Sequence, residues 1–304
     1  MFRLTRATDS HAMSGLLSFL VISLMMTTIG VHQALAQNKS RRCDQNRHHQ
    51  RVARNDPTGT RVDLRTLEGA QLYFGPLFNR KRPAKLLMHF HGAPWLIQQH
   101  TAEHWPRAAL VTVHLGVGSN AYRRPFGRPE MFAELLAEVR KELQLENEFS
   151  SILITSFSAG YGAVREILRQ PENRRLVQSL LLLDGIHTSY VPERKVLADG
   201  RGLDTAGLEP FVVFARESLT GSKKFVLTHS EIFPGTYAST TECIDYLLAR
   251  LGLKRKPELR IGPLRMQQLS QVKARGFRVI GFAGNTAPDH VDHLHALPAW
   301  LKHL

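Results

Sequence analysis

The segment Ser151-Ile152-Leu153-Ile154-Thr155-Ser156-Phe157-Ser158-Ala159-Gly160-Tyr161-Gly162 runs from a strand pattern through a turn into a helix pattern. Its first six residues are mostly apolar or β-branched, which predicts a buried strand. Apolar residues at helical spacing then predict a helix over Ala159–Arg169. Ser158 therefore lies on a sharp turn between strand and helix. Such a turn needs small residues two positions before and after the serine, and Ser156 and Gly160 meet this need.

Strand and helix patterns alternate on both sides of this segment. The predicted strands are Arg61–Leu67, Gln71–Phe74, Lys85–Phe90, Leu110–His114, Ser151–Ser156, Val177–Asp184, Lys224–Thr228 and Arg278–Phe282. The predicted helices are Pro129–Leu143, Ala159–Arg169, Thr205–Ser218, Thr240–Leu251 and Asp289–Leu301. This order predicts a mostly parallel, doubly wound sheet with an N-terminal hairpin and helices on both faces. The basic stretch Lys254–Arg275 is interpreted as an insertion or edge excursion before the last strand.

The turn at Ser158 and the order of elements from Arg61 to Leu301 resemble the α/β-hydrolase superfamily. Serine at position 156 departs from the glycine that is usual in this family, but it is small enough to keep the turn. The resemblance implies an α/β-hydrolase fold and a serine hydrolase of the carboxylesterase or lipase type, with Ser158 as nucleophile. We expect no cofactor and no metal.

The resemblance also implies an oxyanion hole made of two backbone N–H groups. One belongs to the residue after the nucleophile, which is Ala159. The other comes from the loop after the third strand of the family fold, where His89-Phe90-His91-Gly92-Ala93 is found. Either Gly92 or Ala93 is expected to supply this second N–H.

The base is expected to be a histidine after the last strand, and His290, His293 and His295 are all available there. His290 follows the strand at a normal loop distance, and Asp289–Asp292 is similar to the Asn-His-Leu-Asp stretch of gastric and lysosomal acid lipases. His295–Trp300 is similar instead to the His-x-Trp-Pro-x-Trp ending of feruloyl-esterase-like proteins. His290 and His293 are the preferred candidates. A zinc site built on these histidines would want a further ligand set.

The acid that orients the histidine has two candidate positions. Asp184 ends an apolar strand and precedes Gly185, so its carboxylate would point to the catalytic edge of the sheet. Glu231 follows the next strand, which is the more usual place in the family. Asp184 is preferred. Glu242 is interpreted as a residue of a helix N-terminus, where negative charge is favourable.

Three loops are expected at the carboxyl ends of the strands, where ligands bind in such sheets. They are Gly116–Arg128, Gly185–Asp204 and Ser230–Ser239. They carry aromatic residues and arginines, namely Tyr122, Arg123, Arg124, Phe126, Tyr190, Phe233 and Tyr237. These side chains could hold an acidic or sugar-like substrate, or they could simply anchor the loops. The loops contain no long apolar lid, so an esterase is favoured over a lipase that acts on fat droplets.

The N-terminus has the pattern of a secretory signal peptide over residues 1–36. Arg3 and Arg6 precede an apolar run, and Ala34-Leu35-Ala36 supplies a cleavage site after Ala36. The alternative is an uncleaved anchor, since the apolar run is nearly long enough to span a bilayer. We expect a polar, basic tail over residues 37–58, a hydrolase domain over 59–304, and a secreted or periplasmic location.

The chain has 304 residues and a formal net charge of +14. No nucleic-acid-binding motif accompanies the scattered basic residues, so no nucleic-acid partner is expected. An electrostatic association with an anionic envelope surface is compatible with the charge. Export would permit a disulfide between Cys43 and Cys243. The oligomeric state is left open.

These patterns predict a secreted serine hydrolase that cleaves a carboxylic ester, or a related acyl bond, through an acyl-enzyme on Ser158. The substrate is expected to be a small-molecule or polymer-linked ester. One alternative is a non-catalytic binding protein that retains the hydrolase fold. Another is an envelope peptidase or acyltransferase that uses the same triad, because one fold hosts many reactions.

Overall fold

The computed structural model describes residues 52–193, 196–197 and 202–304. The predicted signal peptide, most of the predicted tail and Cys43 lie outside the described residues. Ten strands form one sheet: β1 (Thr60–Asp63), β2 (Ala70–Phe74), β3 (Lys85–Phe90), β4 (Ala109–Val113), β5 (Ser151–Phe157), β6 (Val177–Leu183), β9 (Lys224–His229), β10 (Lys256–Ile261), β11 (Gln267–Ala274) and β12 (Phe277–Phe282). A separate two-stranded ribbon pairs β7 (Tyr190–Val191) with β8 (Gly202–Leu203).

The strand order in the large sheet is β1-β2-β4-β3-β5-β6-β9-β12-β11-β10. The six strands from β4 to β12 run parallel, whereas β1 and β2 form an antiparallel hairpin that joins β4. The predicted parallel, doubly wound sheet with an N-terminal hairpin is therefore confirmed. Strand β5 lies in the middle of the sheet, so the turn that follows it opens at the centre of one sheet edge.

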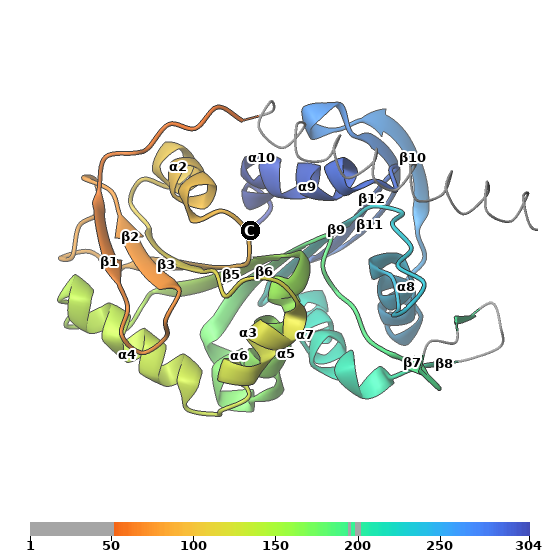
Figure 1. The fold of residues 1–304 in the computed structure, drawn as a ribbon, viewed down its shortest axis with the longest axis horizontal. Coiled ribbons are helices and arrows are strands. Elements are labelled where there is room, and N and C mark those ends of the chain that lie inside the picture. Colours follow the sequence, from red (N-terminus) through yellow and green to blue (C-terminus); the bar gives the residue numbers. More distant parts are fainter. Residues whose placement is uncertain (1–51, 194–195, 198–201) are drawn as a thin grey trace, which may run out of the picture. The chain divides into compact units, whose positions relative to one another are not determined.

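Helices cover both faces of the sheet (Figure 1). They are α2 (Pro94–His104), α3 (Ser119–Phe126), α4 (Met131–Leu143), α5 (Tyr161–Arg169), α6 (Pro171–Leu176), α7 (Glu209–Leu219), α8 (Thr240–Leu251), α9 (Ala287–His295) and α10 (Leu297–Leu301). Short 3-10 turns are η1 (Ser158–Gly160), η3 (Thr205–Gly207) and η4 (Pro263–Arg265). Helices α2, α9 and α10 lie on one face and the others on the opposite face. None of the helices described is long and apolar enough to cross a membrane.

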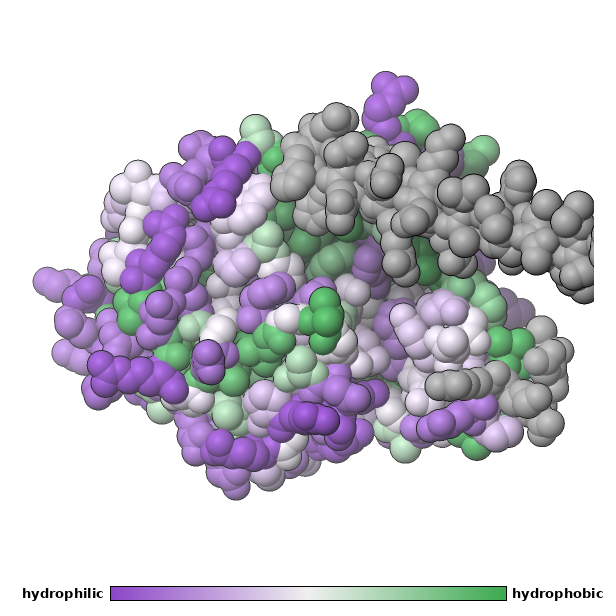
Figure 2. Space-filling view, viewed as in Figure 1, coloured by the Kyte–Doolittle hydropathy of each residue, from purple (hydrophilic) through white to green (hydrophobic). Residues whose placement is uncertain are grey.

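Two apolar clusters, one on each face of the sheet, hold these layers together. The larger cluster packs β-strand side chains against α4, α5, α7 and α8, and the smaller one packs them against α2, α9 and α10. Hydrophilic side chains cover much of the outer margin of the molecule, with apolar patches between them (Figure 2). Burial of these two clusters is the main force that fixes the carboxyl ends of the strands in place.

The predicted edge excursion at 254–275 continues the sheet as the antiparallel strands β10 and β11. Strand β10 is an exposed edge that carries Pro257 and charged side chains, which discourage pairing with another chain. The predicted helix Asp289–Leu301 is divided at Ala296, because Pro298 cannot continue the hydrogen-bond ladder of α9.

Two further sequence predictions concern helix α8. Its N-terminus is a capping box in which Ser239 and Glu242 bond each other's backbone N–H groups, as expected for a helix-terminal Glu242. Cys243 is buried on the same helix. Cys43 is not among the described residues, so a bridge between the two cysteines is left open, as it is by the sequence.

Candidate active site

Ser158 is held in a strained turn between β5 and α5. Its φ is +46°, a left-handed conformation that costs a non-glycine residue about 1–3 kcal/mol. A Cβ added to Gly160 would lie 2.2 Å from the carbonyl oxygen of Phe90, so only glycine lets this turn pack against β3. Ser156 is fully buried on the other side of the turn. The local sequence therefore presents Ser158 at the edge of the sheet, as the small neighbours predict.

The turn after β6 packs directly against the turn that carries Ser158. A Cβ on Gly185 would lie 2.4 Å from the carbonyl oxygen of Ser158, so the two backbones approach as closely as they can. Asp184 precedes this glycine and also has a positive φ, +42°. The contact places the buried carboxylate of Asp184 next to the nucleophile turn.

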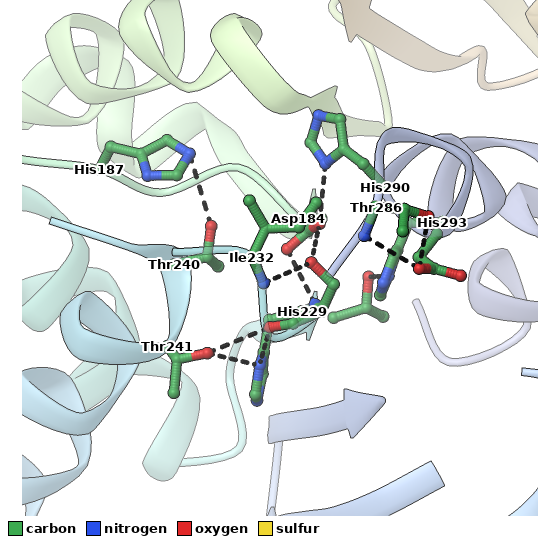
Figure 3. A network of polar contacts seen from close by, with 12 residues as sticks. Asp184, His187, His229, Ile232, Thr240, Thr241, Thr286, His290 and His293 are labelled. Carbon is green, nitrogen blue, oxygen red and sulfur yellow. Dashed lines mark hydrogen bonds and ion pairs between the residues drawn. The ribbon is translucent and has the colours of Figure 1, made fainter. Parts of the chain in front are cut away.

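The carboxylate of Asp184 receives three hydrogen bonds (Figure 3). Its Oδ2 lies 2.7 Å from Nδ1 of His290 and 2.6 Å from Oγ of Ser230, and its Oδ1 accepts from the backbone N–H of Ser230 at 2.9 Å. A carboxylate only accepts, so Nδ1 of His290 carries the proton and Nε2 is left as an acceptor. This is the tautomer that a general base requires.

Electrostatics keep Asp184 ionised. Burial by itself would raise the pKa of Asp184, but the imidazoles of His293 and His290 and the Ser230 hydrogen bonds outweigh it and hold the pKa well below its ordinary value. An ionised Asp184 can stabilise a positive charge on His290 when that ring takes up a proton.

Ser158, Asp184 and His290 line one cavity of about 270 Å³. The ring of His290 packs on Phe157, the residue before the serine, with 4.5 Å between ring centroids. No hydrogen bond joins Ser158 to His290 among the described residues. Catalytic hydrogen bonds of this kind often tighten only when substrate is bound. The three side chains therefore share one site with room for a reacting group between them.

The loop after β3 lies beside the turn that carries Ser158, because the ring of His91 stacks on that of Phe157 with 5.8 Å between ring centroids. His91 and Gly92 both have a positive φ, +68° and +120°, and the N–H groups of Gly92 and Ala93 find no acceptor in the described part of the chain. The N–H of Ala159, in the first turn of η1, likewise has none there. Backbone N–H groups that have no acceptor can bind a developing oxyanion.

His89 holds the same loop in shape. It is fully buried, its Nε2 donates to the carbonyl oxygen of His91 at 2.6 Å, and its Nδ1 accepts from Thr155 Oγ1 at 2.7 Å. Burial lowers the pKa of His89 to about 3, so the ring is neutral. The sequence singled out the His-Gly stretch, and His89 emerges as the residue that fixes its geometry.

The structure does not bring His293 or Glu231 to Ser158. His293 is 1% exposed, its Nδ1 lies 2.8 Å from Thr228 Oγ1, and burial lowers its pKa to about 4. Glu231 is exposed, and its backbone N–H donates to the carbonyl oxygen of Gly284. His295 is buried at the end of α9. His290 and Asp184 are thus the histidine and the carboxylate that line one cavity with Ser158.

Four of the seven predicted loop residues are either buried anchors or cavity walls. Tyr122 and Tyr190 are buried anchors: the first donates to the carbonyl oxygen of Gly116, and the second to Glu242. Arg123 and Tyr237 line a second cavity of about 700 Å³ that also reaches Ser158. Sequence reasoning missed other walls of this cavity, among them Tyr161, Arg165 and His187. Two of these wall residues could have been found from the sequence, because Tyr161 and Arg165 follow Ser158 at helical spacing.

One group of described side chains has the spacing of a metal site. His100, Glu103 and His104 on α2 each offer a ligand atom, and these atoms lie within 4.8 Å of one another. None of them lines either of the cavities at Ser158. A cavity of about 760 Å³ lies at the amino ends of the parallel strands, beside Lys85 and Ser151. Both features therefore lie away from Ser158.

Comparisons with known proteins give matches of structure only. No protein-family model and no curated protein matches the sequence. The structure is similar to the acetyl xylan esterase from Aspergillus awamori, with a TM-score of 0.48, 12% identity, and coverage of 81% of this chain and 100% of that one. It is similar to a feruloyl esterase module from Clostridium thermocellum, with a TM-score of 0.48, 12% identity, and coverage of 81% and 89%. It is also similar to S-formylglutathione hydrolase from Staphylococcus aureus, with a TM-score of 0.43, 13% identity, and coverage of 80% of this chain and 94% of that one.

Proposed function

We propose that this chain, which has the α/β-hydrolase fold, is a serine hydrolase that cleaves a carboxylic ester through an acyl-enzyme on Ser158. One observation carries the proposal. The Asp184–His290 hydrogen bond of 2.7 Å lies in the wall of a cavity that Ser158 also lines. Nucleophile, base and acid therefore come from the ends of three elements that meet at one sheet edge.

In the first half of the reaction, Nε2 of His290 takes the hydroxyl proton of Ser158 as the serine oxygen attacks the ester carbonyl carbon. Asp184 stays ionised and stabilises the imidazolium that results. The N–H groups of Ala159 and of Gly92 or Ala93 bind the negative oxygen. His290 then gives its proton to the departing alcohol as the carbon–oxygen bond breaks.

In the second half, water attacks the acyl-enzyme. His290 accepts one proton from the water, and the remaining hydroxyl adds to the acyl carbon. The bond to Ser158 breaks, and the serine oxygen takes back the proton. The products are a carboxylic acid and an alcohol, and no other reactant is consumed.

The compartment is a further part of this proposal. The signal-peptide pattern over residues 1–36 supports export, to the periplasm or beyond the cell. A formal charge of +14 would favour contact with an anionic envelope surface. Fractionation of cells that express the full chain, followed by N-terminal sequencing of the exported protein, would test cleavage after Ala36.

The experiment that tests the chemistry is labelling with a fluorophosphonate probe and turnover of p-nitrophenyl acetate. The parent protein should do both, and Ser158→Ala should do neither. Ser222→Ala, which removes an exposed serine elsewhere, is the matched control. Equal labelling of Ser158→Ala and parent would mean that Ser158 is not the nucleophile. A folded parent that neither labels nor turns over any ester, amide or acetylated glycan would instead be a binding protein.

A further inference from the structure

Two cavities meet at Ser158. The smaller one, about 270 Å³, contains His290 and apolar walls from Ile232 and Pro234. The larger one, about 700 Å³, extends over α5 toward Arg165. Ser158, His187 and Tyr237 belong to both, so the nucleophile stands where the two cavities join. An ester bound at Ser158 would place one of its halves in each cavity.

The position of His290 decides which half goes where. The departing alcohol must receive its proton from His290, so the alcohol half belongs in the smaller cavity, where that ring lies. The acyl half then extends into the larger cavity. The side chains of the larger cavity therefore select the acyl group.

The larger cavity has an arginine on the same helix face as the nucleophile. Tyr161 and Arg165 follow Ser158 by three and seven positions, which is the spacing of one helix face. The guanidinium carbon of Arg165 stands 5.4 Å from the centroid of the Tyr161 ring. Seven helical positions correspond to about 10 Å, and helix side chains lean back toward the N-terminus, so the guanidinium lies within reach of an acyl chain bound to Ser158.

Arg165 lies in the wall of the larger cavity and has one ion-pair partner in the described part of the chain. Its side chain is 13% exposed, and its buried Nε has no hydrogen-bond partner in the described part of the chain. Glu166 forms an ion pair with Arg165, with 3.6 Å from Nε to Oε1, and its other oxygen accepts a 2.7 Å hydrogen bond from Arg169, so two guanidinium groups share this one carboxylate. A Cβ on Gly207 would lie 3.2 Å from Nη1 of Arg165, so the guanidinium packs closely against this glycine.

The charge around this cavity is positive on balance. Arg123, Arg165 and Arg169 line it, against Glu166 and Asp204. The Oδ1 of Asp204 accepts the backbone N–H of Ala206, and the carboxylate keeps its charge, so three cationic side chains face two anionic ones. Arg123 is exposed at the rim, where it bonds Asn120 at 3.0 Å. A guanidinium prefers carboxylate or phosphate oxygens, which it can bind in pairs.

We infer that the larger cavity binds an acyl group that ends in a carboxylate, so the preferred substrates are monoesters of dicarboxylic acids. Arg165 binds the distal carboxylate, and Arg123 adds positive charge at the rim. This inference rests on the proposed function, since it names the acyl group that Ser158 would carry. It also accounts for the basic and polar side chains that line this cavity.

The test uses two matched pairs of esters at pH 7.5. p-Nitrophenyl hydrogen succinate and p-nitrophenyl butyrate differ in a carboxylate on the acyl half. para-Acetoxybenzoate and its methyl ester differ in a carboxylate on the alcohol half. The measured quantity is the ratio of kcat/KM for the anionic and neutral member of each pair, in which any general loss of activity cancels.

We expect the parent to prefer the hydrogen succinate over the butyrate. Arg165→Gln should lower that ratio about ten- to a hundredfold, the usual worth of a hydrogen bond to a charged group. Arg165→Lys should retain part of the preference, and Arg216→Gln, which removes an exposed arginine on α7, should leave the ratio unchanged.

Three results would overturn the inference while leaving the proposed function intact. They are ester hydrolysis with no preference for the hydrogen succinate, a preference that does not depend on Arg165, or an Arg165-dependent preference seen only with para-acetoxybenzoate. Failure of the parent to hydrolyse any ester would count against the proposed function itself. In that case, binding of succinate by Ser158→Ala, measured by calorimetry with and without Arg165→Gln, still decides whether the cavity binds a carboxylate.

Discussion

Nδ1 of His290 lies 2.7 Å from Oδ2 of Asp184, although 106 positions separate the two residues. Asp184 directly follows β6 and His290 lies in the first turns of α9, so the sheet and the helix on its face bring them together. Ser230, which follows β9, braces the same carboxylate. In the proposed reaction Asp184 is therefore the acid and His290 the base. Substitution of either residue should lower turnover.

Replacing Asp184 by asparagine should lower kcat by about 10⁴-fold, because the amide no longer stabilises the imidazolium or selects the Nδ1-protonated tautomer of His290. The measurement is turnover of p-nitrophenyl acetate by variants whose circular dichroism matches the parent. Glu231→Gln is the matched control, since Glu231 is exposed and makes no contact with His290. A large loss in the Glu231 variant with little change in the Asp184 variant would mean that Glu231, and not Asp184, orients His290.

The two histidines of α9 should respond differently to the same substitution. His290→Asn should lower kcat about 10³–10⁴-fold, because it removes the group that accepts the serine proton. His293→Asn should keep kcat within about threefold, a change below 1 kcal/mol, because that ring faces Thr228 and not the cavity. Steady-state kinetics at pH 7.5 compares them. The opposite ranking would make His293 the base.

The fold was predictable where local pattern and burial agree. Strand β3 and helix α8 have the bounds that the sequence predicts, because one is a continuous buried apolar run and the other begins with a capping box. Helix α2 was not predicted, because its buried face carries Gln98, Gln99 and His100 in place of apolar residues. The glutamines form hydrogen bonds to chain segments far away in the sequence, which no local pattern reveals.

The candidate site was predictable only as far as it is local. The turn at Ser158 is encoded within a few residues, since Gly160 and Ser156 supply the small neighbours that it needs. The choice between His290 and His293 depends on how α9 is rotated over the sheet, and that rotation follows from packing across the whole apolar layer. The hydrogen bonds from Ser230 to Asp184 are equally non-local, because they depend on the register of β6 against β9.

The nucleophile turn should tolerate no side chain at position 160. Gly160→Ala places a Cβ 2.2 Å from the carbonyl oxygen of Phe90, so β3 and the turn must separate. We expect a loss of about 1–3 kcal/mol in the free energy of unfolding, the usual cost of overpacking, together with reduced turnover. Urea denaturation measures it. Gly202→Ala, where a Cβ meets nothing within 4 Å, is the control and should change stability by less than about 0.5 kcal/mol.

Buried neutral histidines should make the protein sensitive to mild acid. Burial lowers the pKa of His293 from an ordinary value of 6.5 to about 4. Between these values the unfolded chain binds a proton that the folded chain excludes. The stabilisation is therefore complete above pH 6.5 and falls as the pH decreases toward 4, by about 1.4 kcal/mol per pH unit for one such group. His89 and His229, with pKa values lowered by burial to about 3 and 4, add to the same slope.

His293→Asn isolates one part of this effect, because an asparagine amide can still bond Thr228 but does not titrate. The free energy of unfolding, measured with urea between pH 5 and 6.5, should fall less steeply in the variant than in the parent, by about 1.4 kcal/mol per pH unit. His104→Asn, at an exposed position on α2, should keep the slope of the parent. Parallel slopes for His293→Asn and parent would mean that His293 titrates alike in the folded and unfolded chains, and would contradict its burial as a neutral ring beneath the Asp184–His290 pair.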